Sequence, residues 1–154
     1  MTPAVEIVRC TTAAPEFQGL VRGLDAELRE RYGDVQDLYS PLNKVVEIET
    51  AVVALDASSR APLGCGCFKQ HAPGTIELKR MYVAPQSRGR RIGAQLVTAL
   101  EDWARTLGYT VAVLETGNLQ HEAVALYTRC GYVRTENFPP YDALPASICM
   151  RKNL

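Results

Sequence analysis

Apolar and polar positions in the first half of the chain predict one strand, one helix and then a β-meander. Residues 4–11 alternate as in a half-buried strand, and residues 15–32 place apolar side chains three or four positions apart before a glycine. Residues 34–44 show no clear periodicity and are predicted to form a loop with a short helical turn. Three apolar segments separated by turn residues follow, at 48–55, 63–70 and 75–83.

The second half of the chain alternates helices and strands. Residues 92–107 and 119–130 carry apolar stripes at helical spacing, each closed by a glycine, and a compact apolar strand is predicted at 109–114. Two last strands are predicted at 132–134 and 146–151. The order predicts a single α/β domain over residues 1–154, with a mostly antiparallel sheet and one parallel strand–helix–strand crossing.

Composition and charge narrow the class of protein. Of the 154 residues, 47% are hydrophobic and 22% charged, and the formal net charge is zero. We expect no nucleic-acid partner, because no basic field is available to bind a phosphate backbone. No apolar run approaches the roughly 20 residues of a membrane span, and the first ten residues lack the apolar core of a signal peptide. We therefore expect a soluble, cytoplasmic protein with no membrane contact.

The five cysteines are predicted to be free thiols, because their number is odd and no export signal accompanies them. Cys65 and Cys67 flank a glycine on a predicted strand, so both should point to one face as buried side chains. Two thiols and two scattered histidines, His71 and His121, do not have the spacing of a zinc site, and we expect no metal. Both histidines are expected at the surface.

The most informative segment is 81–94, where a strand enters a loop rich in Arg and Gly that opens into an amphipathic helix. Free N–H groups and the helix dipole make such a start an anion site, and Gly89 and Gly93 would let backbone approach a pyrophosphate. Three side chains add forked donors, those of Arg88, Arg90 and Arg91. From spacing alone, a solvated helix cap with surface arginines is an equally open interpretation. The P-loop pattern is absent, and so is the Rossmann G-x-G-x-x-G after a strand.

Two stretches of the chain resemble the signatures of the GCN5-related N-acetyltransferases (GNAT). Val83-x-Pro85-x-x-Arg88-Gly89-x-x-Ile92-Gly93-x-x-Leu96 resembles their coenzyme A loop, whose Q/R-x-x-G-x-G/A pattern falls on residues 86–91 with Arg91 in place of Gly or Ala. Residues 120–132 resemble N-x-x-A-x-x-L-Y-x-x-x-G-F, with Gln120 in the place of Asn. The resemblance implies a GNAT fold of six or seven strands and about four helices. It also implies acetyl-CoA, without a metal, in a V-shaped cleft between two splayed strands.

The resemblance also implies roles for particular residues. The backbone of residues 79–83 should supply the oxyanion donor, and Tyr127 should protonate the departing thiolate, although a half-buried packing tyrosine is the alternative. Helical spacing places Gln120, Val124 and Tyr127 on one face. The residues expected to contact the cofactor are Met81, Tyr82, Val83, Arg88, Gly89, Arg90, Arg91, Ile92, Gly93, Ala94, Gln120 and Tyr127.

In this fold a carboxylate at the position of Glu77 often acts as the base. Regular strand alternation predicts Glu77, Lys79 and Met81 on one face and Leu78 and Arg80 on the other. A surface salt bridge to Lys79 is the alternative role for Glu77.

Residues 115–117 end the strand that begins at 109, at a place that commonly faces a ligand in α/β sheets. The acceptor pocket is predicted to contain Tyr39, Glu77, Thr116 and Tyr141. For the two tyrosines plain packing stays open.

The sequence therefore predicts an N-acetyltransferase in which a primary amine attacks acetyl-CoA directly within a ternary complex. A catalytically silent coenzyme A-binding or regulatory module of the same fold is the alternative. A plain interaction domain would not need an arginine–glycine loop at a helix start. The acceptor is expected to be a small-molecule or peptide amine, and the resemblance makes a homodimer a reasonable expectation.

Overall fold

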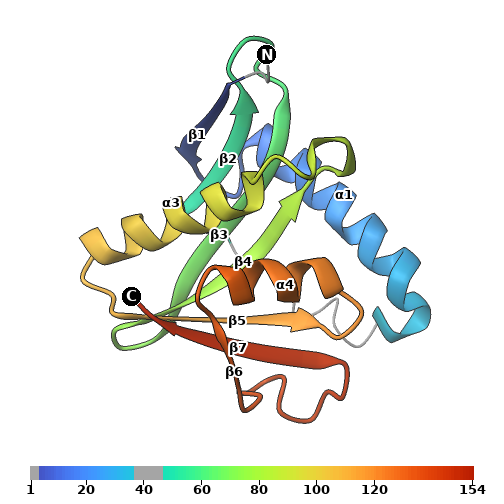
Figure 1. The fold of residues 1–154 in the computed structure, drawn as a ribbon, viewed down its shortest axis with the longest axis vertical. Helices are drawn as coiled ribbons and strands as arrows, with labels where there is room; N and C mark the ends of the chain where they lie inside the picture. Colours follow the sequence, from blue (N-terminus) through green and yellow to red (C-terminus); the bar gives the residue numbers. More distant parts are fainter. Residues whose placement is uncertain (1–3, 37–46) are drawn as a thin grey trace.

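A seven-stranded mixed sheet forms the centre of the computed structural model, which describes residues 4–36 and 47–154 (Figure 1). The strand order is β1-β2-β3-β4-β5-β7-β6, and only the β4–β5 pair is parallel. The strands are β1 (Val5–Cys10), β2 (Ala51–Asp56), β3 (Pro62–Ala72), β4 (Thr75–Val83), β5 (Val111–Gly117), β6 (Val133–Thr135) and β7 (Ser147–Asn153). The prediction of a mixed, mostly antiparallel sheet of six or seven strands is confirmed, and the number is seven.

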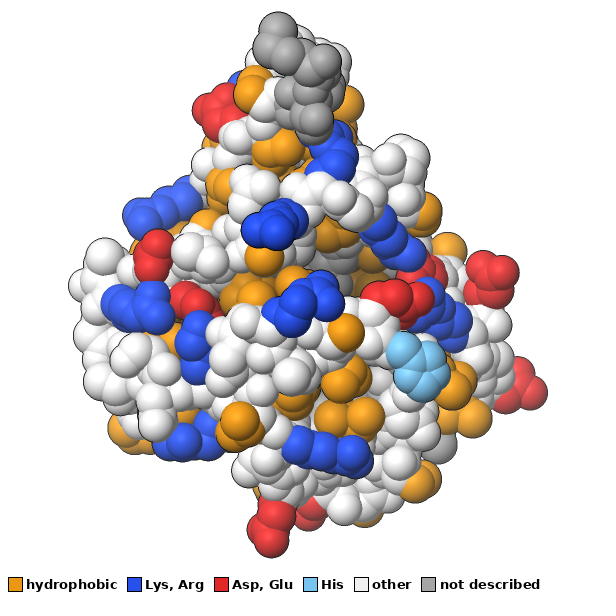
Figure 2. All heavy atoms as spheres, in the orientation of Figure 1, with side chains coloured by type: hydrophobic (Ala, Val, Ile, Leu, Met, Phe, Trp, Pro, Cys, Tyr) orange, Lys and Arg blue, Asp and Glu red, His pale blue; other side chains and the backbone are white. Residues whose placement is uncertain are grey.

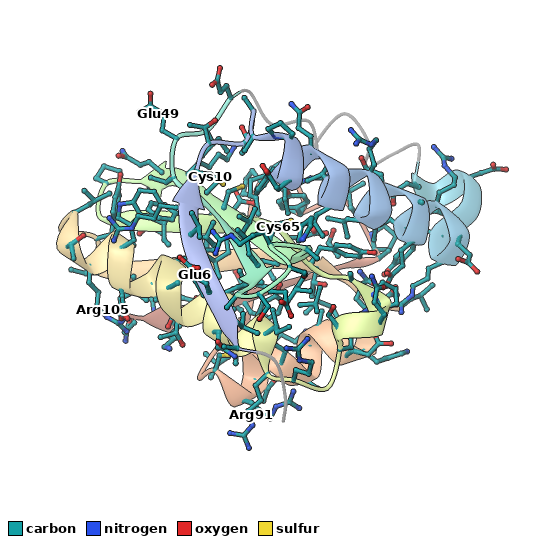
Figure 3. The ribbon with its side chains drawn as sticks, turned by 90° about the horizontal axis from the view of Figure 1, so that it is seen from above. Glu6, Cys10, Glu49, Cys65, Arg91 and Arg105 are labelled. Atoms are coloured by element: carbon teal, nitrogen blue, oxygen red, sulfur yellow. The ribbon has the colours of Figure 1, made fainter. Side chains whose placement is uncertain are left out.

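Helices cover both faces of this sheet. The described residues contain α1 (Pro15–Tyr32), α3 (Ile92–Thr106) and α4 (His121–Arg129), with short 3-10 helices η1 (Gly33–Val35) and η2 (Pro85–Ser87). The described residues thus contain three α-helices, whereas about four were expected. Seen from above, α1 lies on one face and α3 and α4 lie on the other (Figure 3). The predicted site residue Tyr39 lies outside the described residues.

Two hydrophobic cores follow from the alternation of side chains along the strands. On the α3 side, Phe68 and Ile76 of the sheet pack with Leu96 and Leu100. On the α1 side, Phe17 and Leu20 of the helix pack with residues on the opposite face of the strands. Those partners include Cys65 and Cys67, which share a face as predicted, and all five cysteines are free. Burial raises the pKa of the Cys67 thiol to about 12, so this thiol serves as a small apolar side chain.

Strands β4 and β5 separate beyond their fourth pair. Their register runs from Thr75↔Val111 to Leu78↔Leu114 and then stops, and Figure 1 shows the two arrows diverging. The end of β4 therefore has no strand neighbour on this side within the described chain. Such a split leaves backbone N–H and C=O groups of β4 available to a ligand.

A β-bulge lies at the same point of β4. Three steps along β4, from Lys79 to Tyr82, oppose two steps along β3, and Arg80 takes a left-handed φ of 58°. The extra residue breaks the alternation of faces. Lys79 keeps the α1 side and pairs with Cys67, whereas Met81 packs into the α3-side core. The prediction that Glu77, Lys79 and Met81 share one face is therefore wrong.

Arg80 likewise does not lie with Leu78, because its side chain reaches Asp25 of α1. Regular alternation could not reveal the bulge, since β4 itself contains no glycine or proline.

Candidate active site and cofactor cavity

The start of α3 presents free backbone donors beside a sharply turned loop. Arg91 occupies the N-cap position with a left-handed φ of 60°, and the helix begins at Ile92. The first N–H groups of any helix have no partner within it, so this end can bind an anion. Gly89 has a φ of 84° and an added Cβ would meet no atom within 4 Å. In Figure 3 Arg91 projects outward beyond the start of α3.

Gly93 has a packing role that its motif does not reveal. A Cβ at this position would lie 2.9 Å from Leu126 of α4, inside normal contact distance. The missing side chain therefore lets α3 and α4 approach closely, which narrows the space between the two helices.

A cavity of about 750 Å³ adjoins this helix start. It is bounded by α1, the end of β4, the loop before α3, and α4. Eleven of the twelve predicted cofactor residues line it, namely Met81, Tyr82, Val83, Arg88, Gly89, Arg91, Ile92, Gly93, Ala94, Gln120 and Tyr127. Four arginines and two glutamates contribute side chains, so the lining favours an anion. Figure 2 shows basic side chains around a recess on this face, with hydrophobic side chains inside it.

Arg90 is the predicted cofactor residue that does not line the cavity. Its charge acts instead on Asp56, whose pKa is lowered first by the backbone N–H of Ser59 and to a lesser extent by Arg90. Neighbouring arginines in a tight turn cannot all face one cavity, and the sequence did not show which of them would point away from it.

An ion-pair network crosses the mouth of the cavity from α1 to α4. Arg88 donates from Nη2 to Glu27 Oε2 at 2.6 Å and from Nε to the Val83 carbonyl at 3.0 Å. The other oxygen of Glu27 lies 3.2 Å from Arg31 Nη2. Arg31 in turn donates to both carboxylate oxygens of Glu122 at 3.1 Å, and also to a side-chain oxygen of the residue at the N-cap of α4.

That last acceptor is Oε1 of Gln120, the residue predicted to meet the pantetheine arm. Sequence reasoning missed Glu27 and Arg31, because their partners lie 61 and 91 positions away and no local pattern links them.

A smaller cavity of about 110 Å³ adjoins the first on the α1 side of the split sheet. Three of the four predicted acceptor residues line it, and these are Glu77, Thr116 and Tyr141. The structure therefore gathers residues from β4, β5 and the segment before β7 at one place.

Glu77 lies at the floor of this smaller cavity, with only 5% of its surface exposed. The Tyr141 hydroxyl donates to its Oε2 at 3.4 Å, and Lys79 Nζ lies 3.5 Å from the same oxygen. The pair with Lys79 thus exists, but it is buried, and the alternative of a surface salt bridge is wrong. Burial, reinforced by the charge of Glu77, raises the pKa of Tyr141 well above its usual range, so its hydroxyl stays a donor.

Two further groups beside Glu77 were not predicted as site residues. His71 is a surface residue as expected, yet its Nδ1 lies 3.9 Å from Glu77 Oε1 and its ring packs on Phe138. Glu115 lines the smaller cavity and accepts a hydrogen bond from Ser147 Oγ at 2.7 Å. Burial raises the pKa of Glu115. Its place at the end of a parallel strand was the available sequence signal.

Tyr127 lies where the two cavities meet, because its side chain lines both. It is 6% exposed and packs edge-on against Tyr132, with ring centroids 6.0 Å apart. Burial raises its pKa far above the usual range, so the phenol stays protonated at neutral pH. Gln120 and Ala123 line both cavities beside it, whereas Val124 lines neither, which corrects the predicted face of α4.

The site thus combines three chemical elements around one point. A protonated hydroxyl lies at the junction, a buried carboxylate lies in the smaller cavity, and backbone groups of the split strand lie beside both. Proton donors and acceptors placed in this way suit acid–base chemistry on a substrate that spans the two cavities.

The fold and the site define an α/β protein with a split mixed sheet and, next to the split, a helix start whose free N–H groups line a cavity rich in arginine. The sequence pattern of the Acetyltransferase (GNAT) family matches residues 20–132, and the chain belongs to this family. It is 31% identical over 153 residues to an IAA acetyltransferase of Azospirillum brasilense, covering 99% of each chain. Other relatives named N-acetyltransferases match over 39–56% of this chain, which spans 54% of their length or less.

Solved structures share the same architecture. One from Klebsiella pneumoniae, provisionally named an acyl-CoA N-acyltransferase, is 35% identical with a TM-score of 0.77, covering 99% of this chain and 98% of that one. A Bacillus anthracis structure, provisionally named a streptothricin acetyltransferase, was solved with acetyl coenzyme A. It is 21% identical with a TM-score of 0.59, covers 68% of this chain and 61% of that one, and shows the fold alone.

Two absences concern residues 4–36 and 47–154. In that part of the chain no group of three or more His, Cys, Asp or Glu side chains is placed to hold a metal ion. Within the same ranges no helix has the length and apolar character to cross a membrane.

Proposed function

We propose that this chain transfers an acetyl group from acetyl-coenzyme A to a primary amine, by direct attack within a ternary complex. The observation that carries the proposal is the position of Tyr127. Tyr127, whose hydroxyl stays protonated, lines both a large cavity that contains arginines and a small cavity that holds a buried carboxylate. Two substrates bound in adjoining cavities would meet at that hydroxyl.

The residues of the large cavity fit coenzyme A. The amides of Ile92, Gly93 and Ala94 and the guanidinium of Arg88 would hold its diphosphate, since helix starts and forked donors both suit phosphate oxygens. Gln120 and the end of β4 would flank the pantetheine arm. When bound, acetyl-coenzyme A would supply the acetyl group as a thioester.

The chain's own residues divide the proton transfers. Glu77, directly or through water, takes a proton from the attacking amine, and N–H groups of the β4 end stabilise the developing oxyanion. Tyr127 gives its proton to the departing sulfur. One N–C bond forms and one C–S bond breaks, so the net result moves one proton from nitrogen to sulfur.

The relatives support acetyl transfer at the level of their names, which are those of acetyltransferases and N-acetyltransferases. The nature of the acceptor as a small-molecule or peptide amine, the cytoplasmic location and the homodimer stay predictions.

Two measurements test the function. Coenzyme A should raise the melting temperature, because a ligand that binds only the folded state stabilises by about 2.7 kcal/mol at a hundredfold excess over Kd. Acetyl-CoA with a panel of primary amines should release free thiol in proportion to acetylated product. An unchanged melting curve at millimolar coenzyme A would refute the proposal. If coenzyme A binds but no amine causes thiol release, the alternative of a catalytically silent coenzyme A-binding module would be favoured.

A further inference from the structure

The smaller cavity contains more basic groups than the proposed chemistry uses. Two carboxylates, Glu77 and Glu115, line it together with the basic side chains of Lys79 and Arg80. A carboxylate that accepts a proton from an amine does not require an arginine beside it. The two basic side chains therefore call for a separate explanation.

Arg80 is held in a conformation that costs free energy. It is a non-glycine residue with a φ of 58°, and only 9% of its surface is exposed. Backbone strain of this kind persists where the surrounding structure enforces it, and it is concentrated at functional sites. Here the strain belongs to the bulge, which keeps Lys79 and Arg80 on the α1 side, although successive strand residues normally face opposite ways.

The guanidinium of Arg80 is also incompletely paired. Its Nη2 donates to Asp25 Oδ1 at 2.6 Å, but its buried Nε has no hydrogen-bond partner within the described chain. Asp25 is itself largely exposed, with 56% of its side chain accessible. Because a guanidinium offers five donors in a planar fork, Arg80 retains the capacity to bind a second carboxylate.

Lys79 lies next to Arg80 in the chain and lines the same cavity. Its Nζ donates to the Tyr141 hydroxyl at 3.2 Å and lies 3.5 Å from Glu77 Oε2. The cavity therefore has a basic part near the bulge and an acidic part formed by Glu77 and Glu115. A molecule with one negative and one positive end would match both parts.

We propose that the acceptor is a small primary amine that also carries a carboxylate, of the amino-acid type. Arg80 and Lys79 bind its carboxylate, and its amine lies toward Glu77 and Tyr127. The proposal rests on the acetyltransferase function above and specifies its second substrate. A cavity of about 110 Å³ has the volume of roughly four water molecules, which suits a few heavy atoms. An amine with a second positive group would place that group against Lys79 and Arg80, where like charges repel.

The test compares matched amines in the thiol-release assay. Small L-amino acids are each measured beside their amide and their decarboxylated amine, at equal concentrations of the neutral amine so that protonation differences cancel. We expect kcat/KM for the amino acid to exceed that of both analogues at least tenfold. Equal or faster reaction of the carboxylate-free amines would overturn the proposal.

Variants test whether the bulge residues cause the preference for amino acids over carboxylate-free amines. Arg80→Gln should lower the ratio of amino-acid to amine kcat/KM at least tenfold, chiefly through KM for the amino acid. Lys79→Gln should lower it in the same direction, and it serves in place of Arg80→Gln if that variant no longer shows the melting shift with coenzyme A. The control is Arg22→Gln, which removes an exposed arginine of α1 and should keep the wild-type ratio. A ratio unchanged in both bulge variants would contradict the assignment.

Failure of the function and failure of this inference give different results. Absence of thiol release with every amine, with or without a carboxylate, would refute the function. Calorimetric titration of the coenzyme A complex with the amino acids would then decide the inference. Binding lost in Arg80→Gln would sustain the carboxylate site, and no binding to the wild type would overturn it.

Discussion

Glu27 holds the guanidinium of Arg88, the side chain that we assign to the diphosphate of coenzyme A. The two groups approach to 2.6 Å, and Arg31 shares the same carboxylate. A diphosphate and a carboxylate compete for the same forked donors. We therefore expect Glu27→Gln to tighten coenzyme A binding, because the competing charge disappears while the side chain keeps its shape.

The structure sets the size of this effect. The Arg88 side chain is 38% exposed and that of Glu27 is 17% exposed, so solvent screens the pair. Pairs of this kind contribute about 0.2–1 kcal/mol. Since about 1.4 kcal/mol corresponds to a tenfold change, coenzyme A should bind more tightly by up to about fivefold. Arg31 should stay in place, because Glu122 binds it through both carboxylate oxygens.

Titration calorimetry with coenzyme A measures the effect at low and high salt. The gain should shrink with salt, because screening weakens the competing pair. Glu30→Gln is the matched control, since Glu30 is an exposed carboxylate on the same helix and does not line the cavity. In an Arg88→Ala background Glu27→Gln should lose most of its effect. Weaker binding in the single variant would show that Glu27 orients Arg88 for the ligand, and the competition argument would fail.

Three other predictions concern catalysis and the helix start. Tyr127→Phe should lower kcat by about 10²–10⁴ with little change in KM for acetyl-CoA, and because its raised pKa keeps the phenol protonated, the deficit should persist across neutral pH. The rate of Glu77→Gln should be lowest relative to wild type at low pH, where the amine must lose a proton, and should partly recover as pH rises. Small, pH-independent losses of rate in both variants would refute both roles. Arg91→Gly should raise the free energy of unfolding by about 1 kcal/mol in a denaturant titration, because Arg91 has a φ of 60°, and an unchanged midpoint would argue against strain there.

Much of the fold was predictable because its signals are local. Helix α1 and strand β4 have the predicted bounds, since periodicity and the flanking glycines mark their ends. The loop and helix start at residues 88–94 were also predictable, because they depend on a short run of Arg and Gly residues followed by a helical pattern. Local sequence patterns determine where these elements begin and end, and tertiary contacts do not change those bounds.

The composition of the small cavity was less predictable because it depends on tertiary geometry. Glu77, Thr116 and Tyr141 were expected there. Glu115 was noted only as part of the strand end 115–117, and the side chain of Lys79 was weighed only as a surface partner of Glu77. Burial of the Glu77–Lys79 pair arises from the split of the sheet and the segment that carries Tyr141. Neither follows from residues near Glu77 in the sequence.

The split and the bulge in β4 together explain how one strand can serve both cavities. Before Leu78, β4 is an ordinary central strand with partners on both sides. After Leu78 it loses β5, and the extra residue turns Met81 toward α3 while Lys79 and Arg80 stay toward α1. The same few residues thus present backbone to the larger cavity and basic side chains to the smaller one. A regular strand would send alternate side chains to each face. In our proposal, the bulge is therefore the feature that places acceptor recognition next to the cofactor.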